Sequence, residues 1–322
     1  YKVVLDREET SDLFFAAAAR LAKAHLPDEI SEALALARLT ALAKPNGKVR
    51  GIATGDTFRR LVARALAQQP AGDLLNACEP FQYALSTRAG TDSLSHILRF
   101  YTDRDQWATI SVIDGIGAFD HVRRRRMLGK LRQVPSAAAA LPFVRLFYAR
   151  TSTYMWWDED GIAHEIAQGE GGEQGDPLMP ALFALGQHEA LVAARAQLQP
   201  EVLLGAYLDD VFLVTAPHRA RAAFDAVAIA LRDVAGIDTY LGKSRVWHRA
   251  GGAAPPGIAE LGPDVWVGDK PDGHRGFIVL GLPIGDLPFI RESALARVAD
   301  EAQLARLLPQ LPDLQSAWLL LL

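Results

Sequence analysis

Two adjacent aspartates, Asp209 and Asp210, lie between two apolar runs near the middle of the chain. Residues 202–208 and 211–215 each have the length and composition of a β-strand, so we expect a tight hairpin with the two carboxylates at its tip. Like charges side by side repel each other, and a divalent cation shared with a third acidic side chain would relieve that repulsion. A solvated turn is the alternative interpretation, because aspartate is an ordinary turn residue.

A third acidic side chain, Asp114, follows the apolar residues 107–113. That run predicts a strand, and residues 115–120 predict a turn into a basic helix over residues 121–132. Carboxylate oxygens are the ligands that Mg²⁺ prefers. Farther along, the glycine-dense loop at residues 169–177 leads into an apolar helix, and such a turn lets the backbone approach a ligand closely.

Residues 39–53 predict a second hairpin, because two alternating segments flank a Pro-Asn-Gly turn whose Asn and Gly tolerate a left-handed backbone. This hairpin carries three cations, Lys44, Lys48 and Arg50. A two-stranded flap with these groups could clamp a polyanionic phosphate. The alternative is an exposed sheet edge protected by charge.

The composition is that of an ordinary globular protein, with half of the 322 residues hydrophobic and a net charge of −4. A single cysteine, Cys78, excludes an internal disulfide framework and a zinc site built from cysteines. No apolar run approaches the ~20 residues of a membrane span, so we expect no membrane partner. Positive charge is local: four consecutive arginines at 123–126 cover every face of a helix, so at least one or two of them must be solvated.

Seven short stretches follow one another in a characteristic order and spacing along residues 38–285. They are Lys44-Pro45-Asn46-Gly47-Lys48-Val49-Arg50, Gln82-Tyr83-Ala84-Leu85 running on to Thr91-Asp92-Ser93, Asp114 with Ala118-Phe119-Asp120, Gln174-Gly175-Asp176-Pro177-Leu178, Tyr207-Leu208-Asp209-Asp210, Gly242-Lys243-Ser244 and Leu280-Gly281. In this order they resemble the characteristic blocks of reverse transcriptases, most closely those of non-LTR retrotransposons. Any single block is weak support, but seven in the right order are strong.

The resemblance implies an α+β right-hand polymerase. Fingers and N-terminal helices would occupy residues 1–105. A palm of antiparallel sheet packed on helices would occupy residues 106–285, with a fingers-side insertion around 133–170. The start of a helical thumb would occupy residues 286–322. The chain opens with Tyr1 rather than Met and stops inside an apolar helix, so we expect a fragment of a longer polypeptide.

The resemblance also implies RNA-directed DNA polymerase activity, in which a primer 3′-hydroxyl attacks an incoming deoxynucleoside triphosphate with the help of two Mg²⁺ ions, Mn²⁺ being the alternative metal. The partners would be an RNA template, a DNA primer and deoxynucleoside triphosphates. Asp114, Asp209 and Asp210 would be catalytic, and these three with the carbonyl of Gly115 would hold the metals. Substrate contacts would come from Lys44, Arg50, Phe119, Gln174, Gly175 and Lys243. Among them, Phe119 would exclude a ribose 2′-hydroxyl, and Lys243 would protonate the leaving pyrophosphate.

Three residues depart from the family pattern: Gly51 replaces a proline after the fingers arginine, Tyr240 lies where an asparagine is common, and Leu208 replaces a smaller residue. None of these changes affects the acids expected to bind the metals.

Two other functions stay open, an RNA-directed RNA polymerase and a catalytically silent, domesticated RNA-binding domain. We expect an intracellular location, and the nucleus if the enzyme primes on chromosomal DNA, although no targeting signal is visible.

Overall fold

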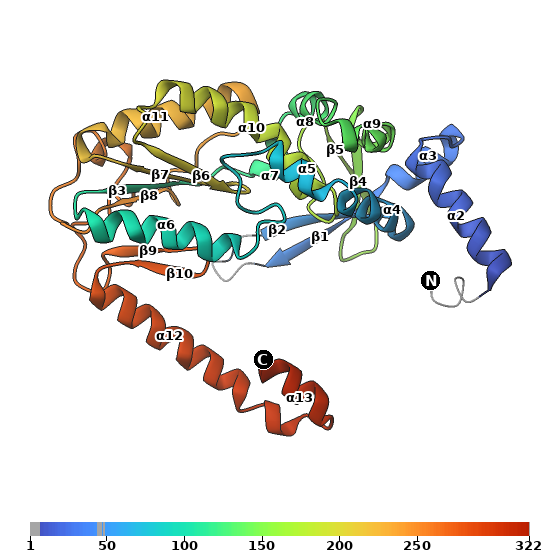
Figure 1. Ribbon diagram of the computed structural model, residues 1–322. Helices are drawn as coiled ribbons and strands as arrows, with labels where there is room; N and C mark the ends of the chain where they lie inside the picture. The colour runs from blue at the N-terminus through green and yellow to red at the C-terminus, as the bar shows by residue number, and fades with distance from the viewer. Residues whose placement is uncertain (1–6, 44–46, 48, 322) are drawn as a thin grey trace. The chain divides into compact units, whose positions relative to one another are not determined.

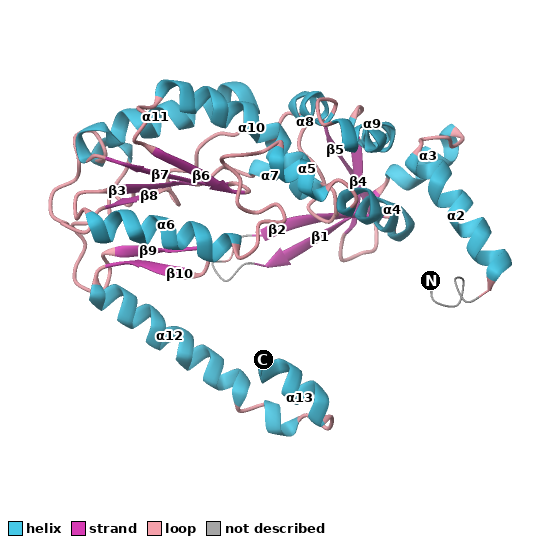
Figure 2. Cartoon of the chain, in the orientation of Figure 1, coloured by secondary structure: helices cyan, strands magenta, loops and turns pink. Residues whose placement is uncertain are grey.

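Three β-sheets and their covering helices make up the chain in a computed structural model, which describes residues 7–43, 47 and 49–321 (Figures 1 and 2). The chain divides into two compact units. The first comprises residues 1–91, 113–213 and 222–240, and the second comprises residues 92–112, 214–221 and 241–322. No helix of the described residues is both long enough and apolar enough to cross a membrane.

Helices make up much of the first unit. They are α2 (Glu8–Ala22), α3 (Asp28–Ala35), α4 (Thr57–Gln68), α5 (Ala71–Asn76), α7 (Ala118–His121), α8 (Arg124–Leu131), α9 (Leu141–Tyr148), α10 (Met179–Gln197) and α11 (Ala220–Ala230), with a 3₁₀ turn at Pro135–Ala140 and a π-helical turn at Leu231–Ala235. Helix α4 begins where Asp56 accepts hydrogen bonds from the amides of Phe58 and Arg59. Helix α10 is buried around most of its circumference, and most of its residues are accordingly apolar.

The first sheet has the strand order β2-β1-β4-β5. Strands β1 (Ala37–Ala43) and β2 (Val49–Gly55) are antiparallel and form the hairpin predicted for residues 39–53. Strands β4 (Ser152–Trp157) and β5 (Ala163–Gln168) form a second antiparallel hairpin, and β1 pairs with β4 in parallel.

Another sheet has the order β6-β7-β3-β8, with β6 (Leu203–Tyr207), β7 (Asp210–Thr215), β3 (Thr109–Ile113) and β8 (Arg245–Trp247). The strand that ends at Ile113 is therefore the neighbour of the strand that begins at Asp210. The predicted basic helix over residues 121–132 is α8, which begins later, at Arg124, because Val122 and Arg123 are not helical, and the predicted turn over residues 115–120 ends in the short helix α7.

The second unit contains α6 (Gly90–Arg104), most of β3, β8, a 3₁₀ turn at Pro217–Arg219, another at Ala259–Leu261, and an antiparallel hairpin of β9 (Gly276–Val279) and β10 (Leu282–Gly285). Its last elements are α12 (Leu287–Ala305), a 3₁₀ turn at Leu308–Gln310 and α13 (Leu314–Leu321). Strands β3 and β8 are antiparallel, and Arg99 of α6 donates to the carbonyl of Pro283 in β10.

Candidate active site

Asp114 follows strand β3 directly and is half-buried. Its carbonyl accepts a hydrogen bond from the amide of Tyr240 at 2.7 Å, and Gly115 forms an antiparallel bridge with Thr239. A side chain at Gly115 would place its Cβ 2.7 Å from Ile237, so the close packing here requires glycine. The backbone around Asp114 is therefore held in place by the segment at residues 237–240.

The turn between β6 and β7 consists of Leu208 and Asp209, and Asp210 is the first residue of β7. The predicted hairpin is thus confirmed, with its tip one residue earlier than expected. Leu208 has a φ of +51°, in the left-handed region that residues other than glycine seldom adopt. Surrounding contacts must hold this turn against its own backbone preference.

One such contact comes from Gln82, whose side chain is 5% exposed. Its amide oxygen accepts a hydrogen bond from the backbone N–H of Leu208 at 2.7 Å, while the chain on either side of it pairs with Ala206 in β6. The sequence places Gln82 in one of the matching blocks but gives no sign of this contact, which joins residues 126 positions apart.

If the chain extends primers, as the resemblance implies, replacing Gln82 by methionine should lower kcat on the order of tenfold and leave KM nearly unchanged. Methionine fills a similar volume but offers no oxygen to the half-buried Leu208 amide, and leaving a buried donor without its partner costs about 1–3 kcal/mol, less where water can reach it. Steady-state extension kinetics would measure the effect. Gln187 of α10 is 1% exposed and serves as the matched control, so an equal loss in Q187M would mean that Gln82 only supports the core.

The glycine-dense loop at residues 169–177 is hydrogen-bonded to three elements, α7, β2 and α4. Gly172 donates its amide to the carbonyl of Phe119, and Gly175 donates to the carbonyl of Ala53 in β2. Arg60 of α4 donates to the carbonyl of Gly175 at 3.0 Å. A Cβ on Gly175 would lie 2.7 Å from the Ala53 oxygen, so only glycine allows this approach.

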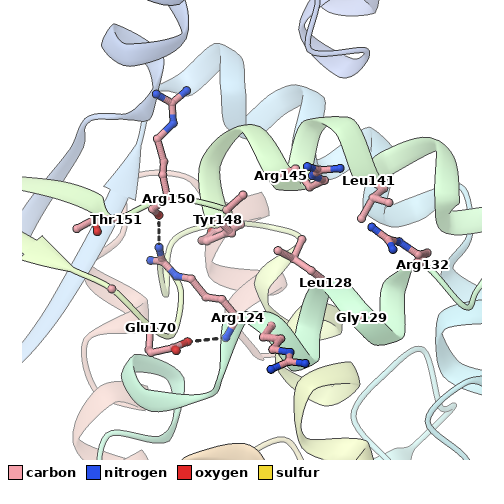
Figure 3. Close-up of a pocket in the computed structure, with 13 residues that line it drawn as sticks. Arg124, Leu128, Gly129, Arg132, Leu141, Arg145, Tyr148, Arg150, Thr151 and Glu170 are labelled. Atoms are coloured by element: carbon pink, nitrogen blue, oxygen red, sulfur yellow. Dashed lines mark hydrogen bonds between the residues drawn. The ribbon is translucent and has the colours of Figure 1, made fainter.

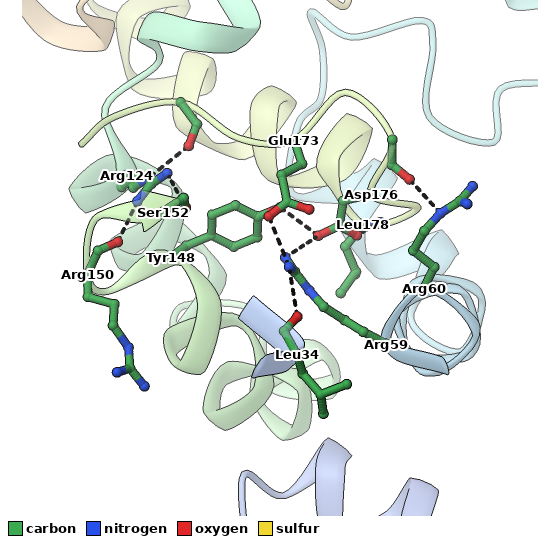
Figure 4. A network of polar contacts seen from close by, with 12 residues as sticks. Leu34, Arg59, Arg60, Arg124, Tyr148, Arg150, Ser152, Glu173, Asp176 and Leu178 are labelled. Atoms are coloured by element: carbon green, nitrogen blue, oxygen red, sulfur yellow. Dashed lines mark hydrogen bonds and ion pairs between the residues drawn. The ribbon is translucent and has the colours of Figure 1, made fainter. Parts of the chain in front are cut away.

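A buried ion network fixes the same loop from within (Figure 4). Arg59 of α4 forms an ion pair with Glu173 at 2.9 Å, and both side chains are about 1% exposed. Arg59 also lies 3.8 Å from a carboxylate oxygen of Asp176, which accepts a 2.6 Å hydrogen bond from the Tyr148 hydroxyl. The guanidinium carbon of Arg59 is 3.8 Å from the centre of the Phe147 ring.

Burial governs the protonation of this network. It raises the pKa of Glu173 by penalising the carboxylate, and the positive charge of Arg59 opposes that rise. Burial and the carboxylate of Asp176 raise the pKa of the Tyr148 hydroxyl well above its usual value. Asp176 lies in one of the blocks that resemble the family, and the sequence gives no indication that it has a structural role in this network. No sequence signal pairs it with Arg59.

Phe119 lies in the short helix α7, half-buried, and its ring stacks on that of Phe183 with centroids 4.4 Å apart and planes 12° from parallel. One face of the ring is therefore occupied by α10, which fixes its orientation. Gln174 is exposed at the start of its block, and Arg50 is exposed on β2.

The structure assigns most predicted site residues to the first unit, namely Arg50, Asp114, Gly115, Phe119, Gln174, Gly175, Asp209 and Asp210. Lys243 is exposed in a turn of the second unit. Lys44 and Lys48 lie outside the described residues.

The half-buried carboxylates of Asp114, Asp209 and Asp210 and the carbonyl of Gly115 supply hard oxygen donors, the chemistry that Mg²⁺ requires. Within the described ranges, no three His, Cys, Asp or Glu side chains are already grouped as a metal site. Because Mg²⁺ is commonly held by one or two carboxylates together with substrate phosphates, the donors fit a metal that completes its shell with the substrate.

Comparison with known proteins gives a consistent result. The family model described as "Reverse transcriptase (RNA-dependent DNA polymerase)" matches residues 42–284. The chain is 24% identical over 223 residues to the retrotransposable element SLACS 132 kDa protein of Trypanosoma brucei gambiense, an alignment that covers 69% of this chain and 18% of that protein.

Solved structures of telomerase have a similar fold. An apo telomerase from Candida tropicalis matches with a TM-score of 0.56 at 10% identity, covering 81% of this chain and 48% of that one. A Candida albicans telomerase in complex with a telomeric RNA fragment matches with a TM-score of 0.55 at 11% identity, covering 82% and 46%. The chain thus spans about a fifth of the curated relative and under half of these telomerase chains.

Proposed function

The chain belongs to the reverse transcriptase family, a family of nucleotidyltransferases with the right-hand polymerase fold, and we propose that it is an RNA-directed DNA polymerase of a non-LTR retrotransposon. It would copy an RNA template by adding deoxynucleotides to a DNA primer. We further propose that residues 1–105, 106–285 and 286–322 act as fingers, palm and start of the thumb. An enzyme of this kind that primes on chromosomal DNA would work in the nucleus.

The observation that carries the proposal is the strand order β7-β3 within a chain that matches this family. It makes the strand preceding Asp114 the neighbour of the strand that begins with Asp210. Carboxylates at the adjoining ends of these two strands would be the donors of a magnesium-dependent nucleotidyl transfer.

In the proposed reaction, the primer 3′-oxygen attacks the α-phosphorus of the incoming nucleotide, the bond to the bridging oxygen breaks, and pyrophosphate leaves. Two bound Mg²⁺ ions would supply a lowered pKa for the 3′-hydroxyl and neutralise charge on the attacking and leaving oxygens. Asp114 and Asp209 would hold the metals with the Gly115 carbonyl, and Asp210 would assist electrostatically. The guanidinium of Arg50, together with Lys44, would bind the triphosphate, Gln174 and Gly175 would face the nucleotide and the template base, and Lys243 would donate a proton to the departing pyrophosphate.

Extension of a labelled DNA primer on an RNA template, with Mg²⁺ and either deoxy- or ribonucleoside triphosphates, tests the proposal. Template-directed addition of deoxynucleotides is the expected result. Preferential addition of ribonucleotides would identify an RNA polymerase, and RNA binding without any extension would identify a silent domain.

Replacing Phe119 by valine should admit ribonucleotides and retain extension with deoxynucleotides. The stacked and immobilised ring would meet a ribose 2′-hydroxyl beneath the incoming sugar, whereas valine leaves room for it. A rise of roughly tenfold or more in the ratio of ribo- to deoxynucleotide kcat/KM is expected, in line with the discrimination available from steric fit. Unchanged sugar selectivity in F119V would contradict this role.

A further inference from the structure

A pocket of about 700 Å³ in the first unit carries a concentration of arginines that the proposed reaction does not use (Figure 3). Helices α8 and α9, the residues that follow α9 and the first residues of the glycine-dense loop line it. Its arginines are Arg124, Arg125, Arg132, Arg145 and Arg150, and its acidic residue is Glu170.

Arg124 is the structural member of this set. It is 5% exposed, and its guanidinium donates to the carbonyls of Gly171 and Arg150 and to the hydroxyl of Ser152. Its amide donates to Glu170, so the acidic side chain of the lining is engaged as well. Arg124 therefore holds together the backbone segments that line the pocket.

The other four arginines are exposed, and none has a carboxylate within 4.0 Å among the residues that the structure describes. Elsewhere in those residues, exposed arginines often do have one, as in the pairs Arg249 with Asp103 and Arg297 with Glu301. In Figure 3, Arg132, which follows α8 directly, and Arg145 of α9 lie on the same side of the pocket. Like charges gathered in this way repel one another, and an anion would relieve the repulsion.

Helix position explains part of this arrangement but not all of it. A cation near a helix C-terminus is favourable, and Arg132 and Arg145 lie there. Arg125, in contrast, lies in the first turn of α8, where the helix dipole disfavours a positive charge. An anion bound in the pocket would compensate for that unfavourable position.

We propose that this pocket is a second RNA-binding site, which holds the phosphate backbone of the RNA apart from the residues assigned to nucleotide addition. The inference rests on the proposed function in taking RNA as the polyanion. Guanidinium groups match phosphate oxygens with two parallel hydrogen bonds each, and an opening lined by the exposed Arg125, Arg132 and Arg145 suits several consecutive phosphates of one strand. Glu170 and Gly169 belong to the glycine-dense loop, so RNA held here would lie against the base of that loop.

The test compares two variants that each lose three charges, R125Q/R132Q/R145Q in the pocket and R7Q/R104Q/R306Q at exposed arginines outside it. Binding of a fluorescent 30-nucleotide RNA would be measured by anisotropy over a range of salt concentrations. The pocket variant should bind RNA roughly tenfold or more weakly, with a slope of log K against log salt shallower by about 2, because three phosphate contacts of a single strand are lost. The control variant R7Q/R104Q/R306Q should have the RNA affinity and the salt slope of the wild type.

A second variant guards against misfolding. In R125E a glutamate takes a first-turn position that favours it, so the fold should be retained while RNA affinity falls. Extension from a pre-annealed short primer-template should persist in R125E, since the proposed reaction assigns Arg125 no role in nucleotide addition. Equal RNA affinity in the pocket variants and the control would overturn the inference. If the wild-type protein binds RNA through the pocket but extends no primer, the proposed function fails and this site stands.

Discussion

Replacing Asp114 or Asp209 by asparagine should reduce template-directed primer extension by a factor on the order of 10³ or more, while the fold is retained. Each change removes a carboxylate assigned to the metals, and the charge stabilisation that metals supply is worth several kcal/mol, each ~1.4 kcal/mol being a factor of ten in rate. The fold should survive because a removed carboxylate no longer repels its neighbours. Single-turnover extension with Mg²⁺, together with urea unfolding, would measure both quantities.

D300N on exposed Asp300 of α12 is the matched control, because it makes the same chemical change at a residue to which no role in the reaction is assigned. It should extend primers at the wild-type rate. D210N should cost less than D209N, since Asp210 is assigned an electrostatic role only. An unfolded D114N, or a D209N protein with normal extension, would refute the assignment of the metal-binding acids.

Replacing Arg59 by methionine should lower the free energy of unfolding by about 3–5 kcal/mol, the usual cost of leaving a buried charge without its partner. Glu173 and Asp176 would then remain buried beside each other with no guanidinium between them. Because the loop that carries Gln174 and Gly175 depends on this network, extension should fall as well. Urea unfolding at fixed pH would measure the loss of stability.

The destabilisation in R59M should be smaller at pH 5 than at pH 8. Burial raises the pKa of Glu173, and Arg59 opposes that rise, so the pKa rises further when Arg59 is removed. An acid whose pKa is higher in the folded state stabilises the fold below its unfolded pKa, about 4.3, and loses that contribution as pH rises through the folded value. Adding E173Q to R59M should therefore restore part of the stability at pH 8.

R126M is the control for this experiment, because Arg126 pairs with Glu189 in a half-exposed setting. Its loss should cost at most about 1 kcal/mol, since solvent screens such pairs. Equal losses in R126M and R59M, or a pH-independent effect in R59M, would show that the buried network does not hold the loop.

Local pattern accounts for the elements that the sequence predicted well. The hairpins at residues 39–53 and around Asp209 could be predicted because each depends on apolar and turn-forming residues only a few positions apart in the sequence. The one-residue shift of the second tip comes from Leu208, which adopts a left-handed backbone that its side chain does not favour. No local rule would assign leucine to that position.

Contacts between distant residues account for what the sequence did not reveal. Arg60 bonds to a carbonyl 115 positions away, and Gln82 to an amide 126 positions away, so neither partner is visible without the fold. The run of four arginines illustrates the same point. Its members were expected to differ in solvation, and the structure separates all four. Arg123 donates to the carbonyl of Asp233, Arg124 is buried, Arg125 lines the pocket, and Arg126 pairs with Glu189.

The central claim is that Asp114 and Asp209 together hold divalent cations, and Mn²⁺ binding measured by electron paramagnetic resonance tests it without relying on activity. With a primer-template and a non-hydrolysable deoxynucleotide present, the wild-type protein should bind about two Mn²⁺ ions. The D114N/D209N variant should bind fewer and more weakly, while D300N should match the wild type. Equal number and affinity of bound Mn²⁺ in wild type and D114N/D209N would contradict the claim.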